Sequence, residues 1–224
     1  MNTLFAKIIK RFQKHKALKP KGRKGILKLG HREYVGGVWE VMGKLQFDFM
    51  VNRGLKPNHV FLDIACGCLR GGRYFIEYLD KGNYLGIEKE KLLIRLGIEK
   101  ELGKELYEIK TPEFIVSEKF EFEKFSKIPT YVLAQSLFTH LNQSDIELCL
   151  KRLRTFVRED CHFYATFFKV PSIRKAHKPS HPHAYFAYML EEMTSFGKKY
   201  GWVTNYIGNW NHPADQKMIE YIAI

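Results

Sequence analysis

The stretch Val60–Gly72, V-F-L-D-I-A-C-G-C-L-R-G-G, decides the fold of this 224-residue chain. It starts as a short apolar run that ends in the carboxylate of Asp63, continues through a bend of small residues, and then enters a helical pattern. A strand, turn and helix of this kind form the unit with which an α/β sheet offers backbone N–H groups to a nucleotide-like ligand. We therefore expect an α/β fold with a ligand site at this turn.

Apolar runs alternate with amphipathic stretches over the rest of the chain, which predicts a doubly wound, mostly parallel sheet. The expected strands are 59–65, 83–88, 113–117, 131–136, 162–169, 202–208 and 217–224, and the expected helices are 70–80, 90–104, 144–157 and 185–199. A further helical pattern precedes the first strand and runs through Val38, Val41, Met42, Leu45, Phe47 and Phe49. The last two strands should form an antiparallel pair at one edge of the sheet. Ser144-Asp-Ile-Glu147 has the pattern of a capping box, which places a helix start at Ser144.

The composition indicates an ordinary globular protein. With 45% hydrophobic residues, the chain can bury the core of one domain. Its four cysteines include no C-x-x-C pair, so we expect neither a disulfide framework nor a structural metal. This cysteine usage favours a reducing, cytoplasmic location.

The net charge of +13 is concentrated at the N-terminus. Residues 1–28 carry ten Lys or Arg and no acid, whereas the remaining 196 residues carry 27 basic and 24 acidic residues. We assign residues 1–24 to a basic, amphipathic helical arm with a linker at 19–25, and residues 25–224 to the folded domain. The apolar face of the arm is formed by Leu4, Phe5, Ile8, Ile9 and Phe12.

Three interpretations of the arm stay open: a solvated extension, a membrane or partner anchor, and an RNA contact. An anchor would place the protein peripherally at the inner face of the membrane. Lys7 and Lys10 interrupt the only apolar stretch of the arm, so it is not a secretory signal. The chain has no apolar run of the ~18 residues that a transmembrane helix needs.

Two carboxylates indicate the charge of the ligand. Asp63 ends the first expected strand, where it would repel a pyrophosphate and attract a cationic group. Glu88 ends the next strand, 25 positions later, where a carboxylate can accept both hydroxyls of a ribose. The bend has no regular G-x-G-x-x-G, which disfavours a dinucleotide.

These residues resemble the class I S-adenosylmethionine-dependent methyltransferases, over about residues 30–224. The resemblance rests on Leu62-Asp-Ile-Ala-Cys-Gly67, Gly86-Ile-Glu88 and Ala134-Gln-Ser-Leu-Phe-Thr-His-Leu141. The chain also looks like a bacterial subgroup marked by Cys68-Leu-Arg-Gly-Gly72, Tyr164-Ala-Thr-Phe-Phe168 and His212-Pro-x-x-Gln-x-Met218. The usual first motif of the family has Gly where this chain has Ala65 and Leu69. The resemblance implies a seven-stranded, Rossmann-like sheet and S-adenosylmethionine as cofactor.

The expected cofactor contacts come from the ends of the first four strands. By resemblance, Glu118 would lie near the adenine amino group, and Gln135 and Ser136 would line the methionine end of the pocket; solvent exposure at a turn is the alternative for Glu118. Arg70 has two further interpretations, an acidic substrate or a surface carboxylate as partner. The full set of expected cofactor-binding residues is Asp63, Ala65, Cys66, Gly67, Arg70, Gly71, Glu88, Glu118, Gln135 and Ser136.

Methyl transfer is an in-line displacement at a sulfonium and needs a base when the acceptor is a hydroxyl. We predict His140 as this base, because it follows the fourth strand; packing against the next helix is the alternative. His31, Tyr34, Trp210 and His212 are expected near the acceptor; an ordinary loop is the alternative for His31 and Tyr34, and a turn that only fixes the edge hairpin is the alternative for Trp210 and His212. His177, His181 and His183 cluster in one loop without Cys or acid, so no metal site is expected.

The sequence therefore predicts a methyltransferase for a small-molecule or glycan-like acceptor, with oxygen as the methylated atom. No Asn-Pro-Pro-Tyr-like tetrapeptide follows the fourth strand, which disfavours methylation of the amino groups of nucleobases or glutamine. Two alternatives stay open, an RNA methyltransferase that uses the basic arm and a membrane-associated binding module without turnover.

Overall fold

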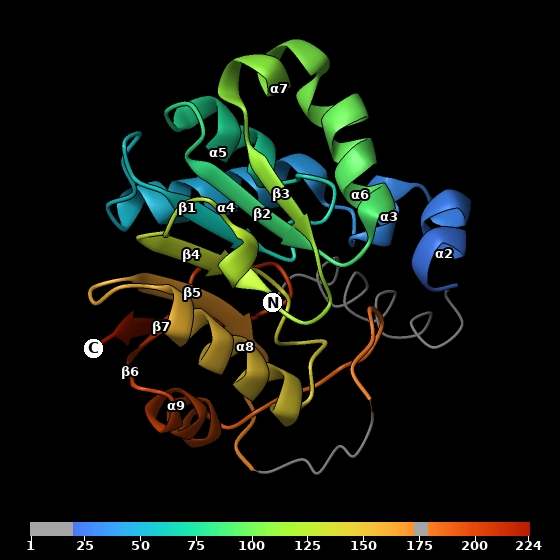
Figure 1. The fold of residues 1–224 in the computed structure, drawn as a ribbon. Helices are drawn as coiled ribbons and strands as arrows, with labels where there is room; N and C mark the ends of the chain where they lie inside the picture. The colour runs from blue at the N-terminus through green and yellow to red at the C-terminus, as the bar shows by residue number, and fades with distance from the viewer. Residues whose placement is uncertain (1–19, 173–178) are drawn as a thin grey trace.

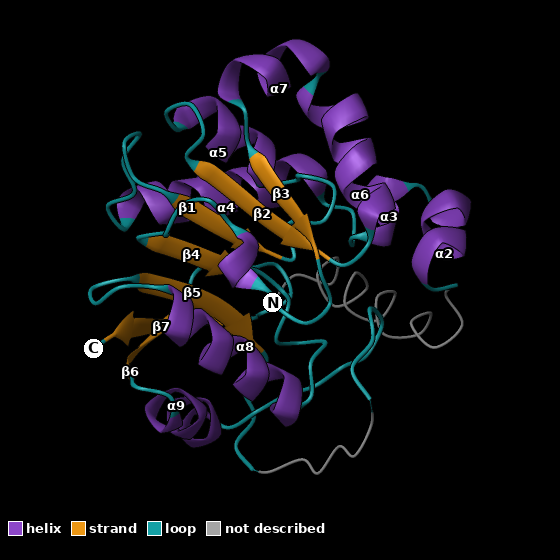
Figure 2. Ribbon diagram, viewed as in Figure 1, coloured by secondary structure: helices purple, strands orange, loops and turns teal. Residues whose placement is uncertain are grey.

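The computed structural model describes residues 20–172 and 179–224. Within them, a seven-stranded sheet runs through the centre of the molecule and carries helices on both faces (Figure 1, Figure 2). The strands are β1 (Phe61–Ile64), β2 (Tyr84–Glu88), β3 (Glu113–Val116), β4 (Tyr131–Ala134), β5 (His162–Phe167), β6 (Trp202–Asn209) and β7 (Lys217–Ala223).

The strand order is β3-β2-β1-β4-β5-β7-β6. The pairs among β1 to β5 are all parallel, while β7 runs antiparallel to both β5 and β6 and joins the edge strand β6 to the sheet. The chain leaves β1 toward β2 on one side and later returns to β4 on the other. The expected doubly wound, mostly parallel sheet with an antiparallel pair at one edge is confirmed.

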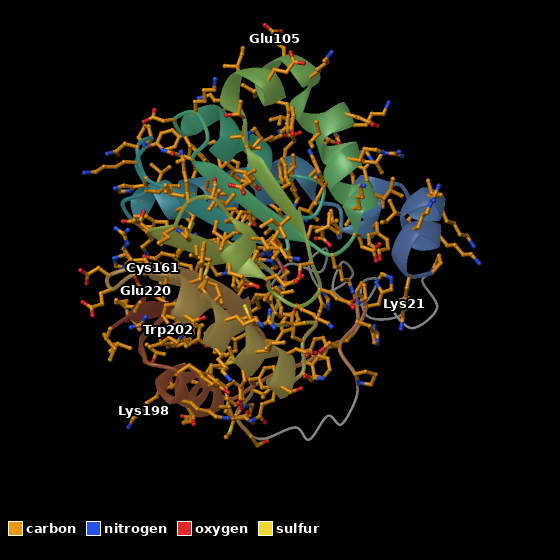
Figure 3. All side chains as sticks on the ribbon, in the orientation of Figure 1. Lys21, Glu105, Cys161, Lys198, Trp202 and Glu220 are labelled. Carbon is orange, nitrogen blue, oxygen red and sulfur yellow. The ribbon has the colours of Figure 1, made fainter. Side chains whose placement is uncertain are left out.

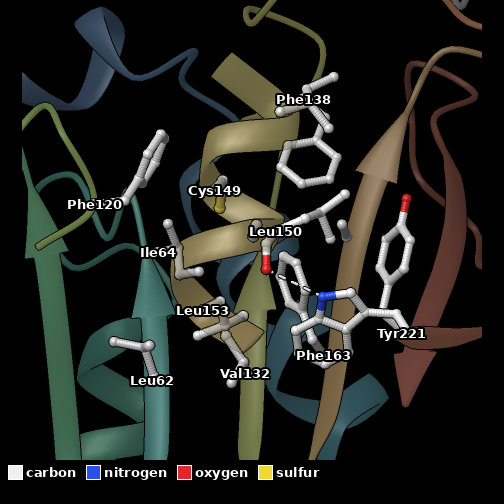
Figure 4. Packing of buried hydrophobic residues seen from close by; sticks show 14 of the residues in the cluster. Leu62, Ile64, Phe120, Val132, Phe138, Cys149, Leu150, Leu153, Phe163 and Tyr221 are labelled. Carbon is white, nitrogen blue, oxygen red and sulfur yellow. Dashed lines mark hydrogen bonds between the residues drawn. The ribbon is translucent and has the colours of Figure 1, made fainter. Parts of the chain in front are cut away.

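The helices pack against the two faces of the sheet. On one face, residues of α4 (Trp39–Asn52), α5 (Gly72–Tyr78) and α7 (Lys104–Lys110) form a core with Phe61 and Leu133. On the other, α8 (Gln143–Phe156) and α9 (Leu190–Lys199) cover the sheet. Figure 4 shows Cys149, Leu150 and Leu153 of α8 facing Leu62, Ile64, Val132 and Phe163 of the strands. Because both faces are covered, β1 and β2 are buried at every position.

Glu105 on α7 and Lys198 on α9 are exposed and point away from this core (Figure 3). No helix in the described ranges is long and apolar enough to cross a membrane. The predicted arm, up to residue 19, lies outside the described residues.

Several predicted boundaries are corrected by the structure. The predicted capping box at Ser144 is wrong: the side chain of Asn142 accepts the backbone N–H of Asp145 at 3.0 Å, so α8 begins at Gln143. The predicted helix 185–199 starts only at Leu190, where Glu192 accepts the N–H of Met189 at 2.8 Å. The predicted linker 19–25 is helical from Gly22 onward, because Gly22–Leu29 forms α2.

The predicted helix 90–104 consists of two parts, α6 (Lys91–Leu96) and the wider helix η1 (Gly97–Leu102). A Cβ on Gly97 would lie 2.8 Å from the backbone carbon of Cys68, so only glycine lets this helix approach the turn after β1. The short helix α3 (His31–Tyr34) and helix α7 were not expected from the sequence.

Candidate functional site

A cleft of about 930 Å³ lies where the carboxyl ends of β1 and β4 meet. The chain reverses its direction of travel across the sheet between these two strands, and ligands of α/β proteins bind at such a point. The volume falls within the ~300–1,000 Å³ range of small-molecule sites. Segments from both ends of the chain line it, from Glu33 to Gln216.

Two carboxylates are buried in the wall of this cleft. Asp63 is 5% and Glu88 is 7% exposed, and they end the neighbouring strands β1 and β2. Asp63 accepts a hydrogen bond from the hydroxyl of Tyr84 at 2.9 Å. Glu88 accepts the backbone N–H groups of Gly67 at 3.1 Å and Glu90 at 3.0 Å, one on each oxygen. Each carboxylate oxygen has a second lone pair, so both groups can still accept bonds from a ligand.

Burial disfavours the charge on both carboxylates. It raises the pKa of Asp63 to about 7, although the bond from Tyr84 lowers it, and the charge of Glu88 adds to the rise. The pKa of Glu88 is also raised by burial, against the two backbone N–H bonds. A cationic ligand placed against Asp63 would therefore relieve an unfavourable charge.

In the turn after β1, two residues that are not glycine adopt the left-handed backbone conformation that glycine favours. Ala65 and Leu69 have φ angles of 61° and 66°, in the left-handed region, beside Gly67 at 57°. The side chain of Leu69 is fully buried and lies against Gly72 and Gly97, so packing compensates the backbone strain. The expected residues Ala65, Cys66, Gly67, Arg70 and Gly71 all line the cleft.

The ends of β3 and β4 supply the next expected residues. Glu118 lines the cleft from an exposed turn after β3, and Gln135 and Ser136 line it after β4. The backbone N–H of Ser136 donates to Thr166 Oγ1 at 2.7 Å, and its hydroxyl is 2.8 Å from Nε2 of Gln216. Gln216 and Thr166 are buried, so they hold the end of β4 in place.

His140 lines the same cleft. Its Nδ1 lies 2.6 Å from the carbonyl oxygen of Ala184. A carbonyl can only accept, so Nδ1 carries the hydrogen and Nε2 is the acceptor of the neutral ring. This tautomer is the one a general base requires.

Residues 31–37 cover the cleft from the N-terminal side. Arg70 donates to the carbonyl oxygens of Gly37 at 2.9 Å and Val35 at 3.3 Å. Tyr34 lines the cleft and packs edge-on against the ring of His183. His31 points elsewhere: with Arg32 it hydrogen-bonds Glu101, and it is not among the lining residues.

The two expected residues of the β6–β7 turn differ in exposure. His212 lines the cleft, whereas Trp210 is 5% exposed and donates its Nε1–H to the carbonyl oxygen of Gln216 at 3.0 Å. The Trp210 ring lies 5.4 Å from that of His212. Trp210 therefore positions His212 instead of lining the cleft.

Two contributors were missed in the sequence. Tyr84 holds Asp63, and Glu101 ties α3 to η1. Tyr84 shares the two-residue period of Gly86 and Glu88, which places all three on one side of β2 and is a signal that the sequence contains. Glu101 lies about 70 residues from its partners and has no comparable signal.

His181 and His183 also line the cleft, while His177 lies outside the described residues. Across residues 20–172 and 179–224, no three His, Cys, Asp or Glu side chains are grouped so that they could hold a metal ion.

No protein-family model and no curated protein sequence matches the chain. Solved structures match its fold. Magnesium protoporphyrin IX methyltransferase from Synechocystis, crystallised with bound S-adenosylmethionine, is 10% identical with a TM-score of 0.62; the match covers 100% of this chain and 99% of that one.

Two further matches have similar scores. An S-adenosylmethionine-dependent methyltransferase from Clostridium acetobutylicum is 9% identical over 88% of this chain and 96% of its own, with a TM-score of 0.58. The CcbJ methyltransferase from Streptomyces caelestis is 11% identical over 81% and 89%, with a TM-score of 0.61. At these identities the comparison establishes the fold, and the chain has the fold of S-adenosylmethionine-dependent methyltransferases.

Proposed function

We propose that this protein is an S-adenosylmethionine-dependent methyltransferase that methylates an oxygen of a small-molecule or glycan-like acceptor. One observation carries the proposal: two buried carboxylates, Asp63 and Glu88, end adjacent parallel strands in the cleft of a methyltransferase-type sheet. A pyrophosphate beside these two acids would be repelled, whereas an ammonium and a ribose would be bound.

The described residues fit this cofactor. Glu88 would accept the ribose hydroxyls, and Asp63 would face the ammonium of the methionine part. Glu118, on the exposed turn after β3, would lie near the adenine. When bound, S-adenosylmethionine supplies a methyl group on a sulfonium, which is open to in-line displacement by a nucleophile.

The chain contributes position and a base. Residues 33–36 and 180–183 line the cleft, and Tyr34 packs against His183 between the two segments, so they would help to position the cofactor and the acceptor. Nε2 of His140 would take the proton from the acceptor hydroxyl as its oxygen forms the new bond to carbon, while the bond from Nδ1 to Ala184 stabilises the resulting imidazolium.

The cofactor assignment can be tested by isothermal titration calorimetry. We expect the wild type to bind S-adenosylmethionine and S-adenosylhomocysteine, but not NAD. Glu88→Gln keeps the size of the side chain and should weaken binding at least ~10-fold, because a charged acceptor of two hydroxyl groups is lost. Glu105→Gln, on the exposed surface of α7, is the control and should bind as the wild type does. Binding of NAD in place of S-adenosylmethionine would refute the assignment.

The reaction can be tested with methyl-labelled cofactor and extracts separated into small molecules, glycans and RNA. Label should enter small molecules or glycans. In His140→Ala, transfer should fall ~10²-fold or more while cofactor affinity stays unchanged. Transfer into RNA alone would contradict the proposed acceptor, and unchanged turnover of the variant would exclude His140 as the base.

A further inference from the structure

Arg70 carries a positive charge in the cleft and makes no direct ion pair with a described residue. Its three hydrogen bonds go to neutral oxygens: the carbonyls of Val35 and Gly37, and Oε1 of Gln135 at 2.8 Å. Burial lowers the pKa of Arg70 to about 10, against the opposing effect of nearby Cys68 and Asp63. A guanidinium in such a place is stabilised by an anionic partner.

His212 adds a hydrogen-bond donor beside Arg70. The backbone N–H of Ala214 donates to His212 Nδ1 at 3.0 Å, so in the neutral ring the hydrogen lies on Nε2. The ring is neutral near pH 7, because burial and the charge of Arg70 lower its pKa to about 4. His212 Nε2 is therefore an N–H group, and it cannot act as a base.

Gln135 lies between Arg70 and His212. These three side chains have more hydrogen-bond donors than acceptors where they meet. The Oε1 of Gln135 accepts from the guanidinium of Arg70, and its Nε2 donates one hydrogen to Ser136 Oγ at 2.5 Å. The second N–H of the amide faces Nε2 of His212, which lies 3.2 Å from Gln135 Nε2. Two N–H groups therefore point toward each other. Rotation of the amide would only place its NH₂ group against the Arg70 cation. In either orientation one donor lacks an acceptor, and a ligand oxygen in the cleft would supply it.

We propose that Arg70, Gln135 and His212 form a subsite for a carboxylate of the methyl acceptor. This inference rests on the proposed function and deepens it: with His140 as the acceptor of a hydroxyl proton, the substrate is a hydroxy acid. Arg70 and Gln135, which the sequence placed among the expected cofactor contacts, are assigned here to the acceptor, because Gln135 links Arg70 to His212 of the β6–β7 turn. Asp63 and Glu88, the carboxylates proposed for the cofactor, lie instead at the carboxyl ends of β1 and β2. Phe168 and Tyr185, stacked with ring centroids 4.7 Å apart, line the same cleft and offer an apolar surface against which the carbon skeleton of the acid would pack.

The subsite can be tested first with matched acidic and neutral probes. The protein is saturated with S-adenosylhomocysteine and titrated with 4-hydroxybenzoate or 4-hydroxybenzyl alcohol, and with glucuronate or glucose. At least one acid should bind ≥10-fold more tightly than its neutral partner. Equal affinities within both pairs, or no binding of either acid, would overturn the proposal.

A pair of variants at one position tests whether Arg70 lacks an anion in direct contact. Gln135→Glu places an internal carboxylate beside Arg70 and should raise the melting temperature of the ligand-free protein, while it weakens binding of the acid probe at least 10-fold. Gln135→Leu removes the amide without supplying a charge and should lower the melting temperature. A melting temperature of Gln135→Glu no higher than that of Gln135→Leu would refute the subsite.

The carboxylate of the cofactor could occupy the subsite instead of the acceptor acid. A comparison of S-adenosylhomocysteine with 5′-methylthioadenosine, which lacks the amino-acid part, distinguishes the two occupants. If acceptor acid fills the subsite, Gln135→Glu should bind S-adenosylhomocysteine within 2-fold of the wild type. A selective loss of S-adenosylhomocysteine, with 5′-methylthioadenosine unaffected, would assign the subsite to the cofactor and overturn the inference. Failure of the wild type to bind S-adenosylhomocysteine would instead refute the proposed function.

Discussion

Burial of the Asp63 carboxylate lowers the free energy of unfolding at neutral pH. Burial raises its pKa from 3.8 to about 7, so the folded state binds a proton more tightly than the unfolded chain. The free energy of unfolding therefore falls as the pH rises from about 4 to 7, and the penalty is fully present above pH 7. Each pKa unit corresponds to about 1.4 kcal/mol.

Asp63→Asn should remove this penalty and abolish the attraction for a cationic ligand. We expect the ligand-free variant to melt several degrees above the wild type at pH 8 and closer to it at pH 5, because the Asp63 carboxyl is protonated at pH 5. Affinity for S-adenosylhomocysteine should fall in the variant. It should also not show the further decrease below pH 7 that we expect of the wild type, in which Asp63 becomes protonated. Thermal melts and calorimetry at both pH values measure this, with the exposed Asp48→Asn as control. A destabilised Asp63→Asn at pH 8 would contradict the argument.

Tyr84 and Gly72 position Asp63 from behind. A Cβ on Gly72 would lie 2.5 Å from the Tyr84 hydroxyl, which donates to Asp63. Gly72→Ala should displace that hydroxyl, and Tyr84→Phe should remove it. Both variants should therefore weaken S-adenosylhomocysteine several-fold and raise the pKa of Asp63 further. Binding measured from pH 6 to pH 9 should show its midpoint at higher pH in both; an unchanged midpoint would exclude the positioning role.

At the scale of elements, the start of α8 shows why a capping-box pattern at Ser144 did not identify the residue that caps the helix. Ser144 and Glu147 have capping-box spacing, but Asn142 precedes them and reaches the N–H of Asp145 first. Ser144 instead donates its hydroxyl to Asn142 Oδ1 at 2.8 Å. Two adjacent capping sequences compete, and only the path of the preceding loop decides between them.

This correction predicts different costs for two alanine variants. Asn142→Ala should lower the free energy of unfolding by ~1 kcal/mol, because the cap of a 14-residue helix is lost. Ser144→Ala should change it by less than ~0.5 kcal/mol, since its side chain is exposed. Urea denaturation distinguishes the two. A larger loss in Ser144→Ala would restore the original prediction.

The strands were predicted within one or two residues because apolar runs bounded by turns are local signals. The order of the expected site residues along the sheet also followed from the sequence, since parallel strands bring their carboxyl ends together. The turn at Ala65 and Leu69 did not follow, because nothing local shows that a buried Leu69 side chain offsets a left-handed backbone.

At the scale of the whole molecule, the site is closed by contacts between distant segments. His183 lies 3.4 Å from the carbonyl oxygen of Pro20, and Arg32 bonds Glu101 across 69 positions. No periodicity encodes such pairs, which explains why His31 was expected near the acceptor and is found on Glu101. Sequence patterns predicted the elements and placed Asp63 and Glu88 side by side at the carboxyl ends of two strands, and only tertiary structure could bring Arg70, Gln135 and His212 together.

The net positive charge of the chain is concentrated near its N-terminus. Residues 1–28 carry ten basic residues and no acid, whereas residues 29–224 are close to balance. The described residues that line the cleft begin at Glu33. Electrostatic association with a polyanion should therefore depend on the N-terminal segment, and cofactor binding should not.

Deletion of residues 1–19 tests whether polyanion binding depends on the N-terminal segment while cofactor binding does not. The truncated protein should bind S-adenosylhomocysteine within 2-fold of the full chain, since α2 and the cleft-lining residues are retained. Sedimentation with anionic phosphatidylserine vesicles and retention on single-stranded RNA, each at 50 and 200 mM salt, identify the partner of the arm. Loss of vesicle binding alone supports the anchor, and loss of RNA binding alone supports the RNA contact. If neither the vesicles nor the RNA bind the full chain, the arm is a solvated extension. If the truncated protein binds both with the same affinity as the full chain, the arm has no electrostatic role in this binding.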